Sequence, residues 1–318
     1  MFGNIVVWLI LVAVAVAAGY GGWRAWRLAR PALKWTATPL AGLLTLLLTL
    51  IVVLIGVGMV QAYSPRGNPV VERTVESTPE RLARGEHISR MMCSACHSPV
   101  SGELPMSGGK DIFADVPFPI GAATPPNLTP GGRIAGWTDG ELQRVIREGT
   151  DPDGHVMPMM ATNSFRVFSQ EDLDSIISYL RSQPAVESTE EPKQSLTPLA
   201  MAMLTLGMLP IKPPPDPVPP PAVPRGPTVE YGAYVAGFID CAICHGDDLS
   251  GGTNPIAPMG PNLVTVKSWT AEQFIDTMRT GVSPTRGPLD PDEMPWESIG
   301  LLEADELTAL YEFIKSVR

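Results

Sequence analysis

The N-terminal part of the chain contains two long runs without a charged side chain. Residues 1–23 form the first run and residues 35–65 the second, and both are dominated by Val, Leu, Ile and Ala. A helix needs about 20 apolar residues to cross the hydrocarbon core of a bilayer. The pattern therefore predicts two transmembrane helices, near residues 4–23 and 39–62.

A short basic loop separates the two runs and indicates their orientation. It carries Arg24, Arg27, Arg30 and Lys34, and short loops rich in Lys and Arg stay in the cytoplasm. The N-terminus and everything after Tyr63 are then expected on the outer side. A cleaved signal peptide is the alternative for the first run, but such peptides begin with basic residues, which the opening "MFGNIVV" lacks.

Beyond residue 66 the pattern changes to short amphipathic segments that occur twice. The recurrent positions are a Pro-Asn-Leu triplet and a Trp-Thr pair, at 126–128 and 137–138 in the first copy and at 261–263 and 269–270 in the second. Each threonine is followed three residues later by Glu141 or Gln273, the capping-box arrangement that starts a helix. Each predicted helix ends at a glycine, Gly149 or Gly281. Two similar helical domains are therefore expected.

The segment between the two copies does not resemble a domain. An uncharged apolar stretch at 196–211 is followed by nine prolines within 212–227, which favour an extended, semi-rigid spacer. The apolar stretch is short for a membrane span. It is interpreted as a helix packed between the two domains, as an element that touches the bilayer, or as a contact with another membrane subunit. A Gly/Pro-rich insertion at 100–125 is expected to be a surface loop, with a role at a cofactor edge or a partner as alternatives.

Charge divides the chain in the same way as hydropathy. All 33 acidic residues follow residue 66, and five of the 23 basic residues precede or occupy it, so the chain's net charge of −10 is the sum of +5 on a basic N-terminal anchor and −15 on an acidic body. This argues against a nucleic-acid partner. It suits a basic soluble partner that is attracted by the field of the protein, although solubility alone also explains an acidic surface.

The four cysteines occur as two copies of one motif, Cys93-Ser-Ala-Cys96-His97 and Cys241-Ala-Ile-Cys244-His245. C-x-x-C-H is the attachment signature of c-type haem, in which the two thiols bond to one porphyrin and the histidine binds its iron. Zinc sites place such pairs only about 15–20 residues apart, and a thioredoxin-like pair needs a strand–helix–strand pattern. The sequence therefore predicts two covalently bound haem c groups.

The repeat also suggests the second iron ligand of each haem. Residues 160–182 align without a gap with residues 294–316, which pairs Met160 with Met294. We predict that these two methionines are metal ligands together with His97 and His245. Thioether ligation raises the reduction potential of a haem.

Other residues near the first motif stay as alternatives. Met157 precedes a proline, as Met294 does, and Met159 is adjacent to Met160; any of these methionines could instead fill gaps in a core. His155 aligns with Leu289, so it is expected in a loop rather than at the iron. His87 is expected at the surface.

Each copy resembles a class I cytochrome c domain. The resemblance rests on a helix that ends in C-x-x-C-H, a proline loop, a middle helix, a methionine loop and a last helix, and residues 78–318 resemble membrane-anchored di-haem cytochromes c of bacteria. It implies that the carbonyls of Pro126 and Pro261 accept a hydrogen bond from the haem-binding histidines, which fixes the ring orientation. It also implies close crossings of the first and last helices, at Gly85 with Tyr179 and at Gly232 with Phe313.

The expected fold class is all-α, with two N-terminal transmembrane helices followed by two cytochrome c-like helical haem domains in tandem. The predicted boundaries are 1–66 for the membrane anchor, 67–186 for the first cytochrome c domain, 187–227 for the linker and 228–318 for the second cytochrome c domain.

The predicted function is single-electron transfer, without enzymatic activity, at the outer, periplasmic face of a bacterial inner membrane. The protein is expected within, or docked to, a respiratory or photosynthetic complex, and the order of its parts resembles the cbb3-type oxidase subunit that receives electrons. The alternatives are a di-haem peroxidase and a cytochrome subunit of a periplasmic dehydrogenase.

Overall fold

The structure is a computed structural model that describes residues 2–114, 116–162, 164–187, 193–209, 211–252 and 259–317. The chain forms two compact units. The first unit contains Met1–Pro65, Phe113–Ala123 and Gln194–Ile211, and the second contains Arg66–Ile112, Thr124–Lys193 and Lys212–Arg318.

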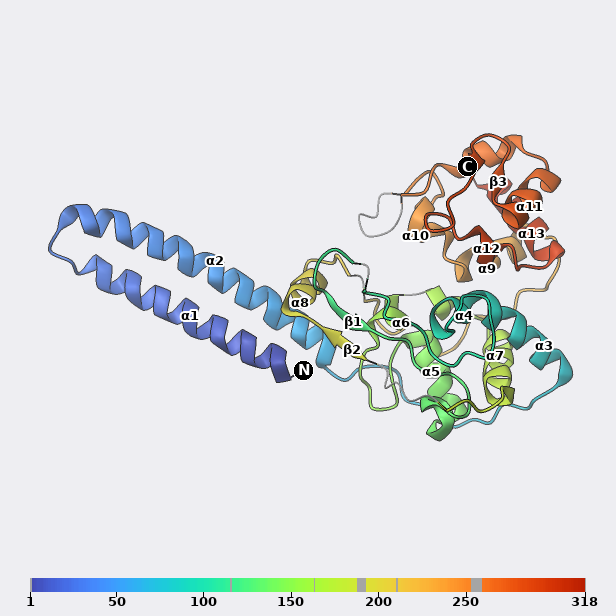
Figure 1. Cartoon of the computed structure of the whole chain (residues 1–318), viewed down its shortest axis with the longest axis horizontal. Helices are drawn as coiled ribbons and strands as arrows, with labels where there is room; N and C mark the ends of the chain where they lie inside the picture. Colours follow the sequence, from blue (N-terminus) through green and yellow to red (C-terminus); the bar gives the residue numbers. More distant parts are fainter. Residues whose placement is uncertain are drawn as a thin grey trace. The chain divides into compact units, whose positions relative to one another are not determined.

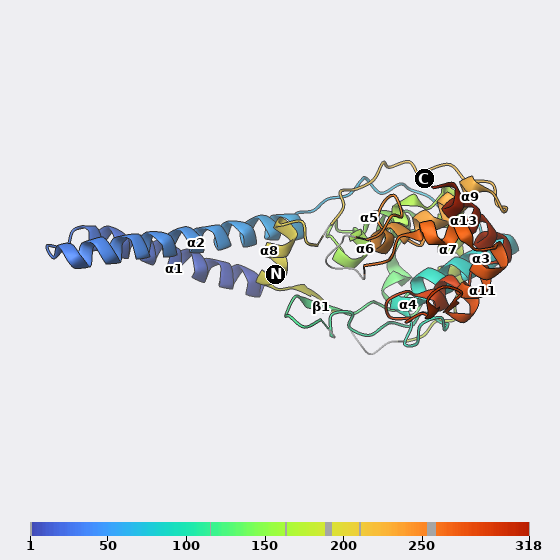
Figure 2. The same cartoon turned by 90° about the horizontal axis from the view of Figure 1, so that it is seen from above.

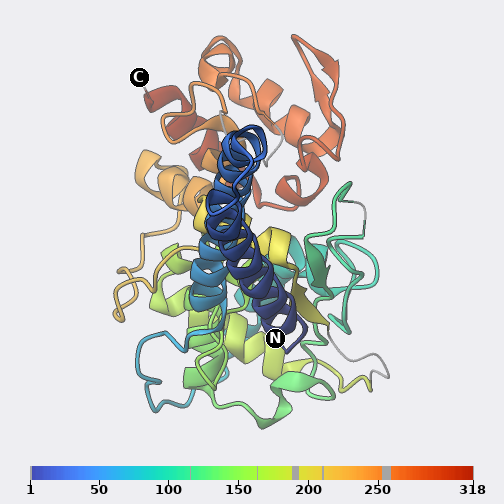
Figure 3. The same cartoon turned by 90° about the vertical axis from the view of Figure 1, so that its left-hand side faces the viewer.

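Two long antiparallel helices, α1 (Phe2–Trp26) and α2 (Pro31–Tyr63), dominate the first unit (Figure 1). Both are long and apolar enough to cross a membrane and include the predicted spans. Proline opens α2, where a missing N–H is not needed. The helices approach closely at Gly22, where a β-carbon would lie 3.1 Å from that of Ala41. Figure 3 views this pair along its length.

The apolar stretch at 196–211 packs against α2. It contains α8 (Pro198–Thr205), preceded by β2 (Gln194–Leu196), which pairs antiparallel with β1 (Gly121–Ala123) from the insertion of the first domain. Ala200, Met201 and Leu204 of α8 are buried in one cluster with Ile55 of α2. Figure 2 shows α8 beside the end of α2. The interpretation as a helix between the two haem domains is therefore wrong, because α8 belongs to the unit of the long helices. Part of the insertion at 100–125, residues 113–123, belongs to that unit too.

The second unit is built from short helices in two similar series. The first series comprises α3 (Pro79–Ile88), η1 (Ser89–Cys93), α4 (Ser94–His97), η2 (Arg133–Gly136), α5 (Asp139–Glu148), α6 (Pro158–Thr162), η3 (Ser164–Val167) and α7 (Gln170–Ser182). The second comprises α9 (Val229–Phe238), α10 (Cys241–His245), η4 (Leu263–Ser268), α11 (Ala271–Thr280), α12 (Trp296–Ile299) and α13 (Ala304–Ser316), with a small hairpin of β3 (Val282–Ser283) and β4 (Gly287–Pro288). The all-α fold class is confirmed.

The local helix signals are confirmed. Thr138 and Thr270 form complete capping boxes at the starts of α5 and α11. Gly149 and Gly281 end these helices in the left-handed conformation, with φ of 60° and 69°, a backbone shape that glycine adopts without a steric penalty.

The two predicted helix crossings are also confirmed. A β-carbon at Gly85 of α3 would overlap the backbone oxygen of Ser175 and lie 2.7 Å from the β-carbon of Tyr179 in α7. Gly232 of α9 meets α13 in the same way, 2.8 Å from the β-carbon of Phe313. At both crossings the two helices are so close that only glycine, which has no β-carbon, fits without a clash.

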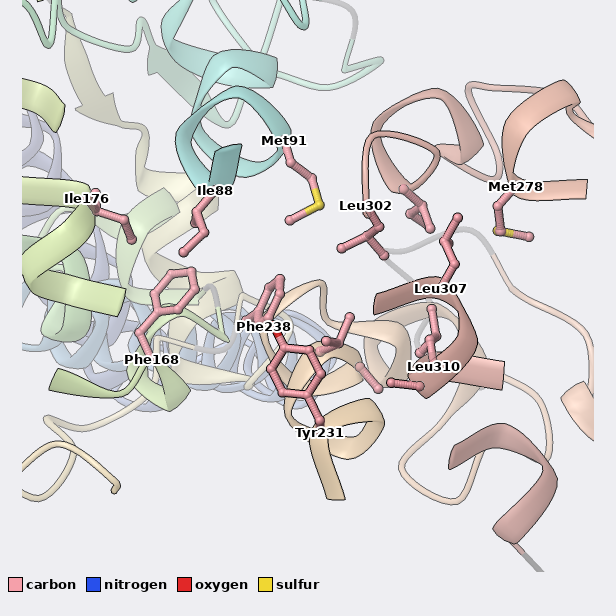
Figure 4. Close-up of a cluster of buried hydrophobic side chains, with 14 of the residues drawn as sticks. Ile88, Met91, Phe168, Ile176, Tyr231, Phe238, Met278, Leu302, Leu307 and Leu310 are labelled. Carbon is pink, nitrogen blue, oxygen red and sulfur yellow. The ribbon is translucent and has the colours of Figure 1, made fainter. Parts of the chain in front are cut away.

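A single hydrophobic core serves both series of helices. Ile88, Met91 and Phe168 of the first series share a buried cluster with Phe238 and Leu307 of the second (Figure 4). The rings of Phe168 and Phe238 stack with centroids 5.4 Å apart. The two halves of the second unit are thus joined by buried apolar contacts.

Candidate haem sites

The first C-x-x-C-H motif lies where α3 continues through η1 into α4. Both thiols of this segment are free, and His97 is buried. Its Nδ1–H donates a hydrogen bond to the carbonyl oxygen of Pro126 at 2.8 Å. With Nδ1 occupied in this way, Nε2 keeps its lone pair and is the atom available to a metal.

The second motif is placed by a sharp turn rather than by a continuous helix. Asp240, between α9 and α10, has φ of 56°, and the chain then forms the single turn Cys241–His245. Nδ1 of His245 donates to the carbonyl oxygen of Pro261, again at 2.8 Å. Its Nε2 is buried and has no hydrogen-bond partner among the described residues. A buried nitrogen without a partner is costly unless a ligand binds it.

A cavity of about 500 Å³ opens beside the second motif. Its lining includes Cys241, Cys244, His245 and Met294, with largely apolar side chains from η4, α11 and α13. A smaller cavity of about 40 Å³ lies beside the first motif, and its lining includes His97, Met157 and Met160. Histidine and methionine are therefore brought together in both halves.

A backbone hydrogen bond distinguishes Met157 from Met160. The N–H of Met157 donates to the oxygen of Gly149 at 2.7 Å, and in the second half Leu289 donates to Gly281 at the same distance. Met157 thus occupies the position of Leu289, and the pairing of His155 with Leu289 that the repeat suggested is wrong. Met160 stays the counterpart of Met294, and its role as a ligand stays a prediction.

A turn with two glycines lies beside each motif, and the sequence pattern alone did not reveal it. Gly108 donates to the oxygen of His97, and Gly251 donates to that of His245, both at 2.9 Å. A β-carbon on the following residue, Gly109 or Gly252, would overlap the oxygen of the second cysteine of its motif. The signal was present as Ser-Gly-Gly at 107–109 and 250–252, but the unequal distances from the histidines concealed it.

The chemistry of these residues fits a covalently bound haem. Burial raises the pKa of the Cys93 and Cys241 thiols to about 12, so their surroundings favour the neutral thiol. Burial also lowers the pKa of His97 and His245, which keeps each imidazole in the neutral form that binds metals. Haem bound at these residues would supply one-electron redox chemistry.

His155 is a loop residue, as expected. Its side chain is 59% exposed and lies 3.5 Å from Asp151, and it is absent from the described linings of both cavities.

The expectation that His87 is a surface residue is wrong. Its side chain is 17% exposed, and Nε2 lies 2.7 Å from Oε2 of Glu306 in α13. The other oxygen of Glu306 accepts from Arg84 at 2.6 Å and from the hydroxyl of Tyr231 at 3.0 Å. Arg84 also binds Asp172 of α7 through Nε at 2.8 Å. This buried cluster, here termed the Arg84–Glu306 network, joins the two halves of the second unit.

Comparison with known proteins agrees with the two sites. The fold and the paired motifs define a di-haem c-type cytochrome. The chain belongs to the family described as cytochrome c oxidase, cbb3-type, subunit III, whose profile matches residues 80–180 and 231–314.

Three curated relatives illustrate the range of proteins with such domains. A protein named diheme cytochrome c-type from Cereibacter sphaeroides is 28% identical over 244 residues, which cover 67% of this chain and 79% of that protein. One of the subunits of nicotinate dehydrogenase from Pseudomonas putida is 32% identical over 130 residues, 40% of this chain and 10% of that protein. The fructose dehydrogenase cytochrome subunit of Gluconobacter japonicus is 32% identical over 110 residues, 30% of this chain and 22% of that protein.

Proposed function

We propose that the protein is a membrane-anchored di-haem cytochrome that passes single electrons between a donor and an acceptor at the outer face of a bacterial inner membrane. The observation that carries this proposal is the pair of buried histidines, His97 and His245, each held by a prolyl carbonyl at 2.8 Å within one compact unit. A rigid ring orientation and a shared core keep both sites in fixed surroundings, as electron transfer requires.

The α1–α2 hairpin supports anchoring with the haem domains outside. Its turn is basic, and the guanidinium of Arg27 lies 4.0 Å from the ring centre of Trp23 while the ammonium of Lys34 lies 3.9 Å from that of Trp26. Tryptophans gather at membrane interfaces, and basic loops stay cytoplasmic. The turn then marks the inner face, and both ends of the hairpin reach the outer face.

The partner that we favour is a membrane oxidoreductase complex. Two relatives are named as subunits of dehydrogenases, which supports the second candidate, a cytochrome subunit that accepts electrons from a periplasmic dehydrogenase. A di-haem peroxidase needs one iron with an open coordination site. Both described cavities are lined by a methionine as well as the histidine, which favours an electron carrier over a peroxidase.

Electron exchange between the two haems of one chain tests the proposed electron transfer directly. The purified protein, carrying both haems, is reduced by less than one electron per chain with a rapid photochemical donor, and the absorbance of the two haems is followed. We expect equilibration at a rate that does not change with protein concentration. A rate that rises in proportion to concentration would contradict a relay within one chain.

Isolation of the protein from native membranes tests whether it is bound to an oxidoreductase complex. With mild detergent and an affinity tag, we expect co-purification of an oxidoreductase. Recovery of the chain alone as a monomer would contradict the complex, and rapid turnover of peroxide by the purified chain would favour the peroxidase instead.

A further inference from the structure

The two ends of α8 are tied to the long helices at different levels. At its N-terminal end, Asn4 Nδ2 donates to the oxygen of Leu196 at 2.6 Å and to the hydroxyl of Tyr63 at 2.8 Å. At its C-terminal end, Thr205 Oγ1 donates to the oxygen of Leu54 at 2.7 Å. The N-terminal end of α8 therefore lies near Tyr63, the last residue of α2, and its C-terminal end lies near Leu54.

With the anchoring proposed above, the outer boundary of the hydrocarbon core is expected within this range. Trp35 packs edge-on against Trp26 near the basic turn, where the inner interface is expected. A hydrocarbon core of ~30 Å corresponds to about 20 helical residues. Counted from Trp35 along α2, the outer boundary lies near Ile55, which is the level reached by the C-terminal end of α8.

The surface of α8 that faces away from α2 is apolar. Met201 is fully buried against Gly58, where no side chain on α2 would fit. In contrast to Met201, three apolar residues are exposed: Leu199, Leu206 and Met208. The exposed fraction of Leu206 is 60%. Residues 196–211 contain no charged side chain, so no charge on this face requires water.

The C-terminal end of α8 closes its own backbone hydrogen bonds. The N–H groups of Leu206, Gly207 and Met208 donate to the oxygens of Ala202, Leu204 and Met203 at 3.1, 3.0 and 2.9 Å. Gly207 makes this turn with φ of 70°, as in the common glycine end of a helix. Backbone that enters a bilayer has to satisfy its polar groups internally, and the three N–H groups at this end of α8 do so.

We propose that the tip formed by Leu206, Gly207 and Met208 inserts into the outer leaflet, with lipid acyl chains as its occupant. The tip follows Thr205, which bonds to Leu54 of α2, and Val53 and Val57 on the same stretch of α2 expose apolar side chains, so the apolar surface of the span continues to the level of the tip. Interfacial segments insert to a depth of about 5–10 Å. The linker segment is thus a third contact of the chain with the membrane.

Site-directed spin labelling tests this inference, which rests on the proposed membrane anchoring. All four native cysteines belong to the haem motifs, so Leu206→Cys adds a single free thiol to the haem-loaded protein. Leu47→Cys, within the span of α2, is the lipid reference, and Val218→Cys, 72% exposed in the proline-rich segment, is the aqueous reference. Each variant is reconstituted into phospholipid nanodiscs, and the accessibility of the label to oxygen and to a water-soluble nickel complex is measured.

We expect an oxygen-to-nickel ratio at position 206 that is several-fold above that at position 218 and closer to that at position 47. A ratio equal to that at position 218 would overturn the inference. Shielding of position 206 from both reagents in native membranes, but not in nanodiscs, would show that a partner helix covers this surface. That result would also overturn the inference. Nickel access at position 47 would overturn the membrane anchoring itself, which distinguishes the two failures.

Discussion

At the scale of single residues, the iron ligands depend on which methionine of a cluster reaches the histidine. Met157 and Met160 both line the cavity of His97. Met157 is nearly fully buried and repeats the backbone hydrogen bond of Leu289. A position that is filled by leucine in one half needs only an apolar side chain, so Met157 is interpreted as core and Met160 as the ligand.

Replacement of Met160 by alanine tests this assignment, with Met157→Ala as the matched control. We expect Met160→Ala to keep the covalent haem but to lose the ferric methionine–iron absorption band of the first domain. Met157→Ala should keep the band and lower the free energy of unfolding by about 2–3 kcal/mol, because it leaves a cavity in the core. Absorbance spectra and denaturant titrations measure both effects, and the reverse pattern would identify Met157 as the ligand.

At the scale of helices, each half is held by one close crossing. Gly232 of α9 touches the backbone of Ala309 in α13, whereas Gly237 of the same helix has ordinary space, with Val167 Cγ2 3.7 Å from a β-carbon placed there. The two glycines therefore differ in contact and not in helix propensity, which makes them a matched pair.

Gly232→Ala should destabilise the protein and Gly237→Ala should not. The added methyl group at position 232 overlaps backbone, and such overpacking costs about 1–3 kcal/mol. At position 237 the gain in helix propensity, about 0.5–1 kcal/mol, is expected to prevail. Thermal unfolding of the two variants gives the comparison. Equal unfolding temperatures for both would show that the helices can separate at the crossing without cost.

At the scale of the whole molecule, the Arg84–Glu306 network links residues that are far apart in the sequence. Burial raises the pKa of Glu306, but the hydrogen bond and charge of His87 and the charge of Arg84 outweigh it and lower the pKa to about 2. The pKa of Arg84 is raised by its contact with Asp172 against the opposing effect of burial. Removal of one partner from a buried pair leaves an uncompensated charge.

The network predicts loss of stability in acid. The pKa of Glu306 falls from an ordinary 4.5 to about 2 on folding, so its contribution is complete above pH 4.5 and is lost as the pH falls toward 2. Glu306→Gln should lower the free energy of unfolding at pH 7 by about 3 kcal/mol and weaken the pH dependence in that window.

Glu86→Gln is the control for this change. Glu86 forms an exposed pair with Arg90 at 3.0 Å, and exposed pairs contribute only about 0–1 kcal/mol. Denaturant unfolding between pH 2 and 7 measures both variants. An unchanged acid profile in Glu306→Gln would show that the network does not stabilise the folded protein.

The sequence by itself determined the features that depend on neighbouring residues. The cysteine motifs, the capping boxes at Thr138 and Thr270, the glycine ends of α5 and α11 and the two long apolar helices all follow from spacing within a few turns. Tertiary structure decided the features that need residues distant in the chain. Examples are His87 beside Glu306, the turns at Gly108 and Gly251, and α8 on α2, because such pairings are set by packing and leave no periodic signal in the sequence.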